Sequence, residues 1–359
     1  MKLVVFGLSI SSSWGNGHAT LWRGLCRALG ARGHSVVFFE RDVPYYASHR
    51  DLTDMPGGGR LVLYPEWDLV LPIARAELAE ADAAMVTSYC ADGVAAAELV
   101  LDSPARVRTF YDLDTPVTLE RLRRGEPVPY LPPQGLGDFD LVLSYTGGGA
   151  LDELVSRLNA RRVAPLYGSV DPEVHYPVPP RPHYAADLSY LGTYAEDRQE
   201  ALTALFVEPA RQRPAQRFVI GGAQYPQAFP WAPNIWFVRH LPPAEHPAFY
   251  SSSRLTLNVT RAAMAEMGHC PSGRLFEAAA CGVPVLSDRW DGLDRFFTPG
   301  EEILVASGPD EVVAALDLPY EELARIGRAA RERALASHTA ERRAEELEEA
   351  LGATLEVEA

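Results

Sequence analysis

The stretch of sequence that decides the fold lies in the second half of the chain and reads Ser272-Gly273-Arg274-Leu275-Phe276-Glu277-Ala278-Ala279-Ala280-Cys281-Gly282-Val283-Pro284-Val285. Its pattern predicts a loop, a helix, a tight turn and a buried strand. Ser272 is a good N-cap residue, and Gly273 leaves room for a ligand beside the first turn. The preceding Asn258-Val259-Thr260-Arg261 predicts the end of another strand. A strand, a loop, a helix and a second strand in this order are typical of a parallel α/β unit.

The start of this helix has the chemistry of a nucleotide site. A helix N-terminus offers free N–H groups and a partial positive charge, which suit a pyrophosphate, and Arg274 adds a full charge there. Glu277 lies one turn further on, where its carboxylate can accept hydrogen bonds from both hydroxyls of a ribose. The same residues also fit a capped helix with a solvated Arg and Glu, and the pattern alone leaves both interpretations open.

Working outward, short apolar runs alternate with amphipathic stretches along the whole chain, such as the helix expected over 19–32. The strands that these runs predict are 3–9, 35–40, 84–89, 106–111, 141–145, 188–192, 217–221, 235–238, 255–258 and 283–287. The pattern occurs twice, on either side of the Pro-rich segment 176–182. We therefore expect two doubly wound, Rossmann-like parallel-sheet α/β domains facing a central cleft.

The domain boundary is expected near residues 170–184. The N-terminal domain then covers 1–170 and binds the acceptor, and the C-terminal domain covers 171–335 and binds the nucleotide. The last 40 or so residues predict helix, and we expect the segment 336–359 to pack back toward the N-terminal domain.

Composition limits the class of partner. The 359 residues carry 33 Lys and Arg against 48 Asp and Glu, a net charge of −15. This excess of acid argues against a nucleic-acid partner, because such affinity comes largely from neutralising phosphates. The four cysteines are scattered and show no zinc-ligand spacing, which argues against a zinc site and against a disulfide framework. We expect neither a metal nor a cofactor. No apolar run reaches the ~18 residues of a membrane span, and the first residues predict a buried strand rather than a signal peptide, so we expect a cytoplasmic protein.

Residues 273–288 resemble the donor-binding signature of GT-B glycosyltransferases of the retaining, group-1 type. In that family a Glu followed by Ala contacts the ribose of a sugar nucleotide, a role that the resemblance gives to Glu277. Residues 296–304 and the expected helix 309–316 are similar to the same family. The runs 257–261 and 274–282 look most like the subgroup related to the spore maturation protein CgeB. The resemblance covers most of 184–335 and extends weakly to the first half.

One position departs from the family pattern. The wider family has a Glu eight residues before the ribose-binding Glu, where this chain has His269, and Glu266 is three residues out of register. In the family that first Glu contacts the donor hexose. The departure leaves open both the identity of the sugar and the stereochemical course.

Further donor-binding candidates follow other strands of the second half. By position and by resemblance, Gly192, Thr193 and Arg198 are expected to hold phosphate oxygens, although Arg198 also fits a surface ion pair. His240 stands where the backbone of similar enzymes reads the base, and an ordinary, partly buried histidine fits equally well. Arg261 is a candidate contact to a phosphate or a carboxylate.

In the first half, the loop after the first strand contains Gly15, Asn16, Gly17 and His18. The glycines permit positive φ and leave space at a helix start, although the pattern is a weak match to a dinucleotide loop. His18 titrates near neutrality and is the candidate general base if the reaction inverts configuration. In a retaining enzyme it would orient the donor sugar, and a structural histidine remains the alternative.

Three more residues follow strands on the expected acceptor side. Asp112 and Asp114 can hydrogen-bond an acceptor sugar or bind a cation, whereas Asp114 also fits an Asx-type cap before Thr115. Tyr145 begins another glycine loop that is expected to line the cleft.

The sequence thus predicts a metal-independent glycosyltransferase that moves a hexose from a UDP, GDP or dTDP sugar to a hydroxyl of a glycan or natural product. Arg274, together with Arg198 and the helix N-termini, is expected to offset the charge on the leaving diphosphate. Two alternatives stay open: a nucleotide-sugar epimerase on the same fold, and a non-catalytic module that binds a nucleotide or glycan.

Overall fold

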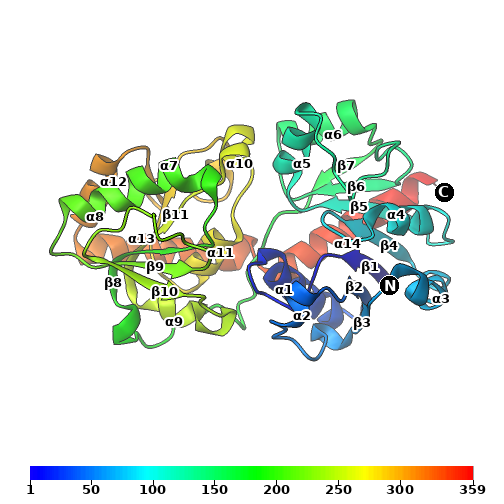
Figure 1. The fold of residues 1–359 in the computed structure, drawn as a ribbon, viewed down its shortest axis with the longest axis horizontal. Coiled ribbons are helices and arrows are strands. Elements are labelled where there is room, and N and C mark those ends of the chain that lie inside the picture. Colours follow the sequence, from blue (N-terminus) through cyan, green and yellow to red (C-terminus); the bar gives the residue numbers. More distant parts are fainter. Residues whose placement is uncertain (359) are drawn as a thin grey trace. The chain divides into compact units, whose positions relative to one another are not determined.

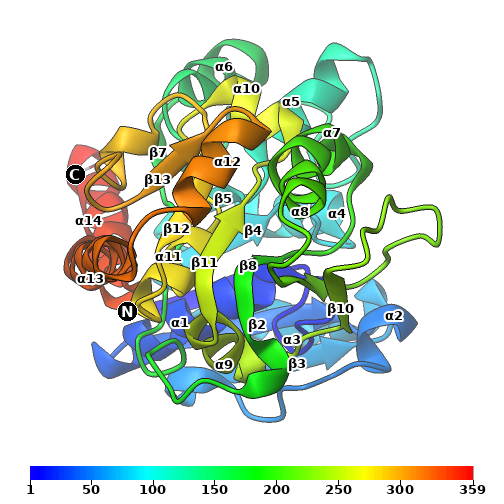
Figure 2. The same cartoon turned by 90° about the vertical axis from the view of Figure 1, so that its left-hand side faces the viewer.

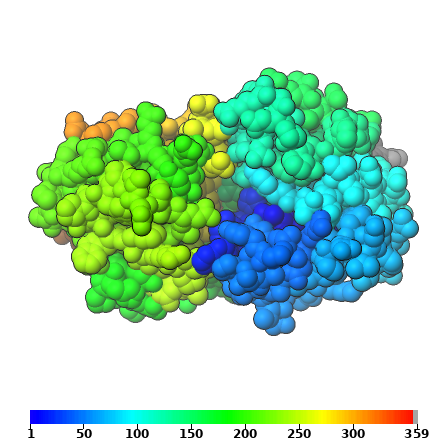
Figure 3. Space-filling view, in the orientation of Figure 1, coloured from blue at the N-terminus to red at the C-terminus, as the bar shows by residue number. Residues whose placement is uncertain are grey.

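The structure is a computed structural model that describes residues 1–358, with side chains described through residue 354. The chain forms two compact units. Unit 1 consists of Met1–Tyr167 and the C-terminal helix, and unit 2 consists of Gly168–Thr339. Figure 1 shows the elements of both units in chain order, and Figure 3 shows one face of the surface in the same colours.

Unit 1 is built on a seven-stranded sheet in the order β3-β2-β1-β4-β5-β6-β7, and every strand pair is parallel. Its strands are β1 (Lys2–Gly7), β2 (Ser35–Arg41), β3 (Arg60–Tyr64), β4 (Ala83–Thr87), β5 (Val107–Asp112), β6 (Leu141–Ser144) and β7 (Val163–Pro165). Its helices are α1 (Gly17–Ala31), α2 (Pro44–Ala47), α3 (Trp67–Leu78), α4 (Gly93–Leu101), α5 (Thr115–Arg123), α6 (Gly149–Leu158) and α14 (Ala340–Glu358).

Alternate residues of the central strand β1 build two cores, one on each face of the sheet. Val4 and Phe6 pack with buried residues of α3, α4 and α6. Leu3 and Val5 pack on the opposite face with residues of α1 and α14, among them Leu347. The last helix of the chain, α14, therefore completes the hydrophobic core of unit 1, although it lies some 340 residues after β1 in the sequence.

Unit 2 repeats this architecture on six strands in the order β10-β9-β8-β11-β12-β13, again all parallel. Its strands are β8 (Ala186–Leu191), β9 (Phe218–Gly222), β10 (Ile235–Arg239), β11 (Ser253–Asn258), β12 (Val285–Asp288) and β13 (Leu304–Ala306). Its helices are α7 (Gln199–Leu202), α8 (Glu208–Gln212), α9 (His246–Ser251), α10 (Ala262–Met267), α11 (Gly273–Ala280), α12 (Pro309–Leu316) and α13 (Tyr320–Ser337), with a π-helical turn, Thr203–Val207, joining α7 to α8. Figure 2 shows helices α7, α8 and α12 on one face of this sheet and α9, α11 and α13 on the other.

The strand order places a topological switch point in each unit. In unit 2 the chain leaves β8 toward β9 on one side and returns to β11 on the other, so β8 and β11 are neighbours whose following loops diverge. Open parallel sheets bind ligands at such points, beyond the carboxyl ends of the strands. In unit 1 the corresponding pair is β1 and β4.

The prediction of two parallel-sheet α/β domains is confirmed, and all ten expected strands exist with ends shifted by a few residues. Three strands were missed, namely β3, β7 and β13. The helix expected near the C-terminus is two helices, α13 and α14, because His338 leaves helical geometry and its carbonyl accepts a hydrogen bond from the N–H of Val170. None of the helices in residues 1–358 combines the length and apolar character needed to span a bilayer.

Since α14 completes a core, we predict that Leu347→Ala lowers the free energy of unfolding by about 2–5 kcal/mol, the usual cost of a buried Leu-to-Ala cavity. Leu347 is fully buried in unit 1. Urea denaturation measures this change. Glu349→Ala, an exposed position on the same helix, is the control and is expected to stay within about 0.5 kcal/mol of the wild type. An equal, small effect of both substitutions would contradict the packing described for α14.

Candidate functional site

The switch point of unit 2 is organised by the guanidinium of Arg274. Its Nη1 donates to the carbonyl of Leu191 at the end of β8 (2.8 Å), and its Nη2 donates to the carbonyl of Val259 just after β11 (3.0 Å). The side chain of Arg274 thus ties together the two strands at which the loops diverge. Among the described residues no carboxylate forms an ion pair with the guanidinium, and the carboxylates of Asp288 and Glu277 act on it only at longer range.

The start of α11 is capped as the sequence predicts. The Oγ of Ser272 accepts hydrogen bonds from the backbone N–H (3.4 Å) and the Nε (3.1 Å) of Arg274. Gly273 is the first residue of the helix. Gly192 lies close to the same arginine: a Cβ added there would lie 2.8 Å from the hydroxyl of Tyr190 and 3.1 Å from Nη1 of Arg274. A larger residue at position 192, directly after β8, would therefore displace the side chain of Tyr190 or Arg274.

Arg198 adds a second cation beside this helix start. Its Nη2 donates to the carbonyl of Thr193 (2.6 Å), whereas its Nε is buried and has no hydrogen-bond partner. Burial and the nearby charge of Arg274 lower the pKa of Arg198. Two neighbouring guanidinium groups without a facing carboxylate are an unfavourable arrangement by themselves, and an anion would relieve it. Thr193 enters this arrangement through its backbone carbonyl.

Glu277 lies one turn into α11 and is 9% exposed. Its carboxylate accepts no hydrogen bond from the described residues, and burial raises its pKa against the opposing effects of His246 and Arg274. The nearest basic atoms are Nδ1 of His246 at 3.8 Å and Nε2 of His175 at 4.0 Å. Because the carboxylate makes no hydrogen bond, the structure is compatible with the expectation that Glu277 is available to a ligand. The Glu277 side chain also has polar neighbours and is not packed against aliphatic residues alone.

The remaining candidates of unit 2 have structural contacts of their own. The Nε of Arg261 pairs with the carboxylate of Asp197 at 2.9 Å, on a partly exposed surface. His240 has a left-handed backbone (φ 49°), and its N–H donates to the carbonyl of Gly222. His269 is also left-handed (φ 47°), and its N–H donates to the carbonyl of Asp291. These two backbone conformations mark constrained loops near the strand ends.

In unit 1 the loop after β1 is held rigidly. Asn16 is the N-cap of α1: its Oδ1 accepts from the N–H of His18, and its Nδ2 donates to the carbonyls of Ser9 and Ser12. Gly15 has a φ of 60°, as expected, and Gly17 has open space where a Cβ would lie. Asn16 therefore has a structural role, while Gly17 leaves the start of α1 accessible.

His18 and Asp114 face each other, with Nε2 and Oδ2 3.7 Å apart. Burial lowers the pKa of His18, and Asp114 opposes that effect. A neutral imidazole beside a carboxylate is the protonation state that a general base needs. The structure thus brings together two residues that the sequence placed on separate loops.

Asp112 differs from the sequence expectation. It is fully buried, its Oδ1 accepts from the N–H of Asp114, and burial, together with the Asp114 charge, raises its pKa to about 6. The Asx turn is therefore made by Asp112, because the side chain of Asp114 makes no capping hydrogen bond at the start of α5. The Tyr145 side chain packs in part against the core shared by α1 and α14, which lowers its availability to an acceptor.

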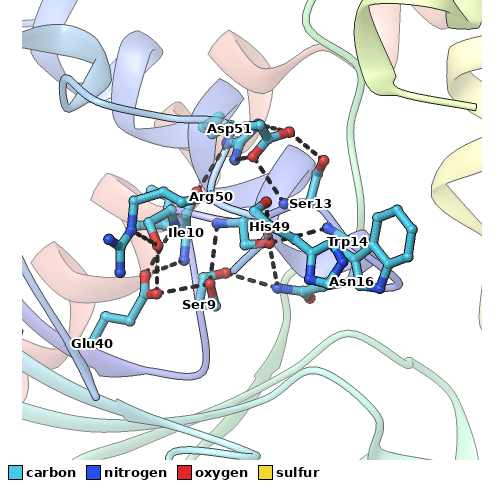
Figure 4. A network of polar contacts seen from close by, with 12 residues as sticks. Ser9, Ile10, Ser13, Trp14, Asn16, Glu40, His49, Arg50 and Asp51 are labelled. Atoms are coloured by element: carbon cyan, nitrogen blue, oxygen red, sulfur yellow. Dashed lines mark hydrogen bonds and ion pairs between the residues drawn. The ribbon is translucent and has the colours of Figure 1, made fainter. Parts of the chain in front are cut away.

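Sequence reasoning missed Glu40, which organises the loop after β1 (Figure 4). Its buried carboxylate accepts hydrogen bonds from the N–H groups of Ile10 and Ser11 and from the hydroxyls of Ser9 and Ser11. The next layer is formed by the segment after α2, where His49 stacks on Trp14 with ring centroids 4.0 Å apart. An acid at the end of the second strand, beside a serine-rich loop, was the signal available in the sequence.

Comparison with known proteins adds the following. Residues 198–349 match the family model described as glycosyl transferase-like. Comparison of the sequence with curated proteins finds no match.

Several solved structures share the fold over nearly the whole chain. Sucrose-phosphate synthase from Thermosynechococcus elongatus is 16% identical with a TM-score of 0.72, and all of both chains is covered. HepE from Anabaena, in complex with UDP and glucose, is 14% identical with a TM-score of 0.66 over 98% of this chain and 100% of the other. An α-glucosyltransferase in complex with UDP-glucose and DNA is 12% identical with a TM-score of 0.70 over 98% and 99%. The chain thus has a GT-B-like glycosyltransferase fold.

We predict that Glu40→Ala lowers the free energy of unfolding by about 3 kcal/mol or more, because it leaves four buried donors without an acceptor. Glu40→Gln keeps part of the acceptor capacity and is expected to cost less. Urea denaturation with Glu98→Ala, an exposed helical glutamate of the same unit, as control provides the measurement. A loss no larger than that of the control would show that the carboxylate does not hold the loop.

We also predict a specific pH dependence from His175. Burial lowers its pKa to about 4, below the ordinary value of 6.5, so between these values the unfolded chain binds a proton that the folded chain does not. The free energy of unfolding therefore falls as pH decreases through this window, by about 1.4 kcal/mol per pH unit for one such group. Burial raises the pKa of Asp112 to about 6, so its protonation below pH 6 increases the free energy of unfolding, but it does so equally in every variant.

The test compares the wild type with His175→Asn by denaturation in EDTA at several pH values. The difference in their free energies of unfolding is expected to shrink as the pH falls from about 6.5 toward 4. The exposed His183→Asn serves as control and should leave the pH profile unchanged. A pH-independent difference for His175→Asn would rule out a neutral, buried imidazole at this position.

Proposed function

We propose that the protein is a glycosyltransferase that transfers a hexose from a nucleoside-diphosphate sugar to a hydroxyl acceptor. In this proposal unit 2 binds the donor at the N-terminus of α11. UDP is the first nucleotide to test, because two of the similar structures are complexes with UDP and glucose or with UDP-glucose.

The single observation that carries the proposal is the clustering of two positively charged side chains, Arg198 and Arg274, at the switch point. Arg274 and the buried Nε of Arg198 lie beside the capped, open start of α11, without a carboxylate in ion-pair contact with either. A diphosphate supplies the missing negative charge, and its oxygens accept from guanidinium N–H groups and from the helix N-terminus. Glu277, with its vacant acceptor capacity, lies one turn further on, at the spacing of the adjoining ribose.

In this mechanism the cations act mainly on the leaving group. As the bond between the sugar carbon and the diphosphate oxygen breaks, negative charge grows on the diphosphate. Two of the five N–H groups of Arg274 remain after its contacts with Ser272, Leu191 and Val259, and Arg198 retains its buried Nε–H. Donors that are fixed before the reaction stabilise developing charge without reorganisation, and we propose that they do so here without a metal ion at the diphosphate.

The acceptor is proposed to be a glycan or natural product bound by unit 1. His18, paired with Asp114, is the proposed base if the reaction inverts configuration, since Asp114 would stabilise the imidazolium that forms. The net charge of −15 disfavours a nucleic-acid acceptor, yet one similar structure contains DNA, so acceptor panels should include it. We also propose that the protein is cytoplasmic and belongs to the subgroup related to the spore maturation protein CgeB.

We predict that UDP binds the full chain, and that Glu277→Ala lowers its affinity by about ten- to a hundredfold, because hydrogen bonds to a charged acceptor are worth about 1.5–3 kcal/mol. Calorimetry in EDTA measures the affinity, with Glu266→Ala as a matched control on α10. Unchanged UDP affinity in Glu277→Ala, or no binding of UDP, GDP or dTDP, would refute the donor site. Product formed from the donor alone would indicate an epimerase, and binding without any turnover would indicate a non-catalytic module.

A further inference from the structure

Three residues far apart in the sequence converge inside unit 2. His175 lies in the segment before β8, His246 is the first residue of α9, and Glu277 lies in α11. One side-chain donor atom from each residue falls within 4.8 Å of the others. The side chain of His175 is fully buried, and those of His246 and Glu277 are 14% and 11% exposed.

The hydrogen bonding of His246 fixes which of its nitrogens faces the acid. Its Nε2 lies 3.3 Å from the carbonyl of Leu241, which can only accept, so Nε2 carries the proton. In a neutral ring Nδ1 then presents a lone pair, and Nδ1 is the atom 3.8 Å from the Glu277 carboxylate.

Ring nitrogens and a carboxylate therefore face each other without a hydrogen bond between them. Both ring nitrogens of His175 and Nδ1 of His246 are buried and without a hydrogen-bond partner. The distances of 3.8 and 4.0 Å to Glu277 are too long for hydrogen bonds. Buried polar groups are rarely left in this state, and a shared ligand between them accounts for all three at once.

We propose that His175, His246 and Glu277 bind a divalent transition-metal ion of the zinc type. Two imidazole nitrogens and one carboxylate oxygen are a donor set that zinc takes, with water as the fourth ligand. Tetrahedral zinc holds such atoms about 3.3–3.5 Å apart, so the two contacts with Glu277, at 3.8 and 4.0 Å, need to shorten by about half an ångström, and the two histidine nitrogens, within 4.8 Å of each other, by up to about 1.4 Å. The Leu241 carbonyl on Nε2 of His246 supplies the outer hydrogen bond that usually orients a metal-binding histidine.

The ion would link three separate segments of unit 2. It would hold the segment around His175 against helices α9 and α11, and its binding would add to the stability of the folded state. This proposal does not depend on the proposed transferase activity. It does share Glu277 with the proposed donor site, so zinc and a ribose are alternative ligands of that carboxylate. The absence of zinc-type cysteine spacing does not bear on it, because the ligands are histidines and an acid.

Cobalt provides a direct test, because Co²⁺ in a tetrahedral site has strong visible absorption. The full chain, freed of metal with a chelator, is titrated with Co²⁺ and then with Zn²⁺. We expect one equivalent of Co²⁺ to give a tetrahedral spectrum that Zn²⁺ abolishes, and Zn²⁺ to raise the Tm.

Three substitutions assign the ligands: His175→Ala, His246→Ala and Glu277→Gln should each weaken Co²⁺ binding at least tenfold. His183→Ala, an exposed histidine in the same unit, should not change it. Circular dichroism and Tm in EDTA identify any variant that fails to fold, and Glu277→Gln, the most conservative change, then decides. No tetrahedral spectrum with the wild type, or undiminished affinity in the folded variants, would overturn the proposal. UDP binding, measured in EDTA, tests the donor site separately, so the two proposals can fail independently.

Discussion

The organisation of unit 2 depends on one half-buried cation. The guanidinium of Arg274 is bound by the carbonyls that end β8 and follow β11, and its charge is not met by a carboxylate in ion-pair contact. Carbonyl dipoles make such burial tolerable but do not neutralise it. Arg198 lies close by, and its buried Nε–H has no hydrogen-bond partner among the described residues, so two guanidinium groups gather at this end of the sheet. The local structure is complete without a ligand, yet its electrostatics favour an anion.

Unit 1 has the same topology, but the side chain that organises the loop at its strand ends is an acid instead of an arginine. At its switch point the organising group is the Glu40 carboxylate, which gathers the N–H groups and hydroxyls of the loop after β1. That acid consumes the donors which a dinucleotide-binding loop would present to phosphate, so this loop is not equipped like the one in unit 2. What it presents is the start of α1, with Gly17 and the His18–Asp114 pair. One fold thus gathers two guanidinium groups at the strand ends of one unit and a histidine–carboxylate pair in the other.

The sequence predicted the elements whose physical signal is local. Apolar runs identified ten strands, nine of them largely buried and the edge strand β10 partly exposed, and the Ser272 cap followed by Gly273 located the start of α11. The strands β7 and β13 escaped because each has three residues at a sheet edge, too few for a periodicity, and β3 alternates between buried and exposed positions beside a glycine-rich turn. The break between α13 and α14 depends on a contact with Val170, which no local pattern encodes.

The site was predicted only in part for the same reason. The position of Arg274 was foreseen, but not that its side chain spans two strands, because that requires knowing which strands are neighbours. The approach of His175 and His246 to Glu277 joins residues about 30 to 100 positions apart, and their spacing in the sequence does not indicate it. Asp112 was interpreted as a free carboxylate, whereas it is buried and shapes the turn.

The proposed donor site is tested most directly by a crystal structure of the protein with UDP, prepared in EDTA. The account predicts the diphosphate at the α11 N-terminus within hydrogen-bond distance of Arg198 or Arg274, and the ribose hydroxyls about 2.6–3.2 Å from Glu277. A nucleotide bound elsewhere, with Glu277 still lacking a partner, would contradict it.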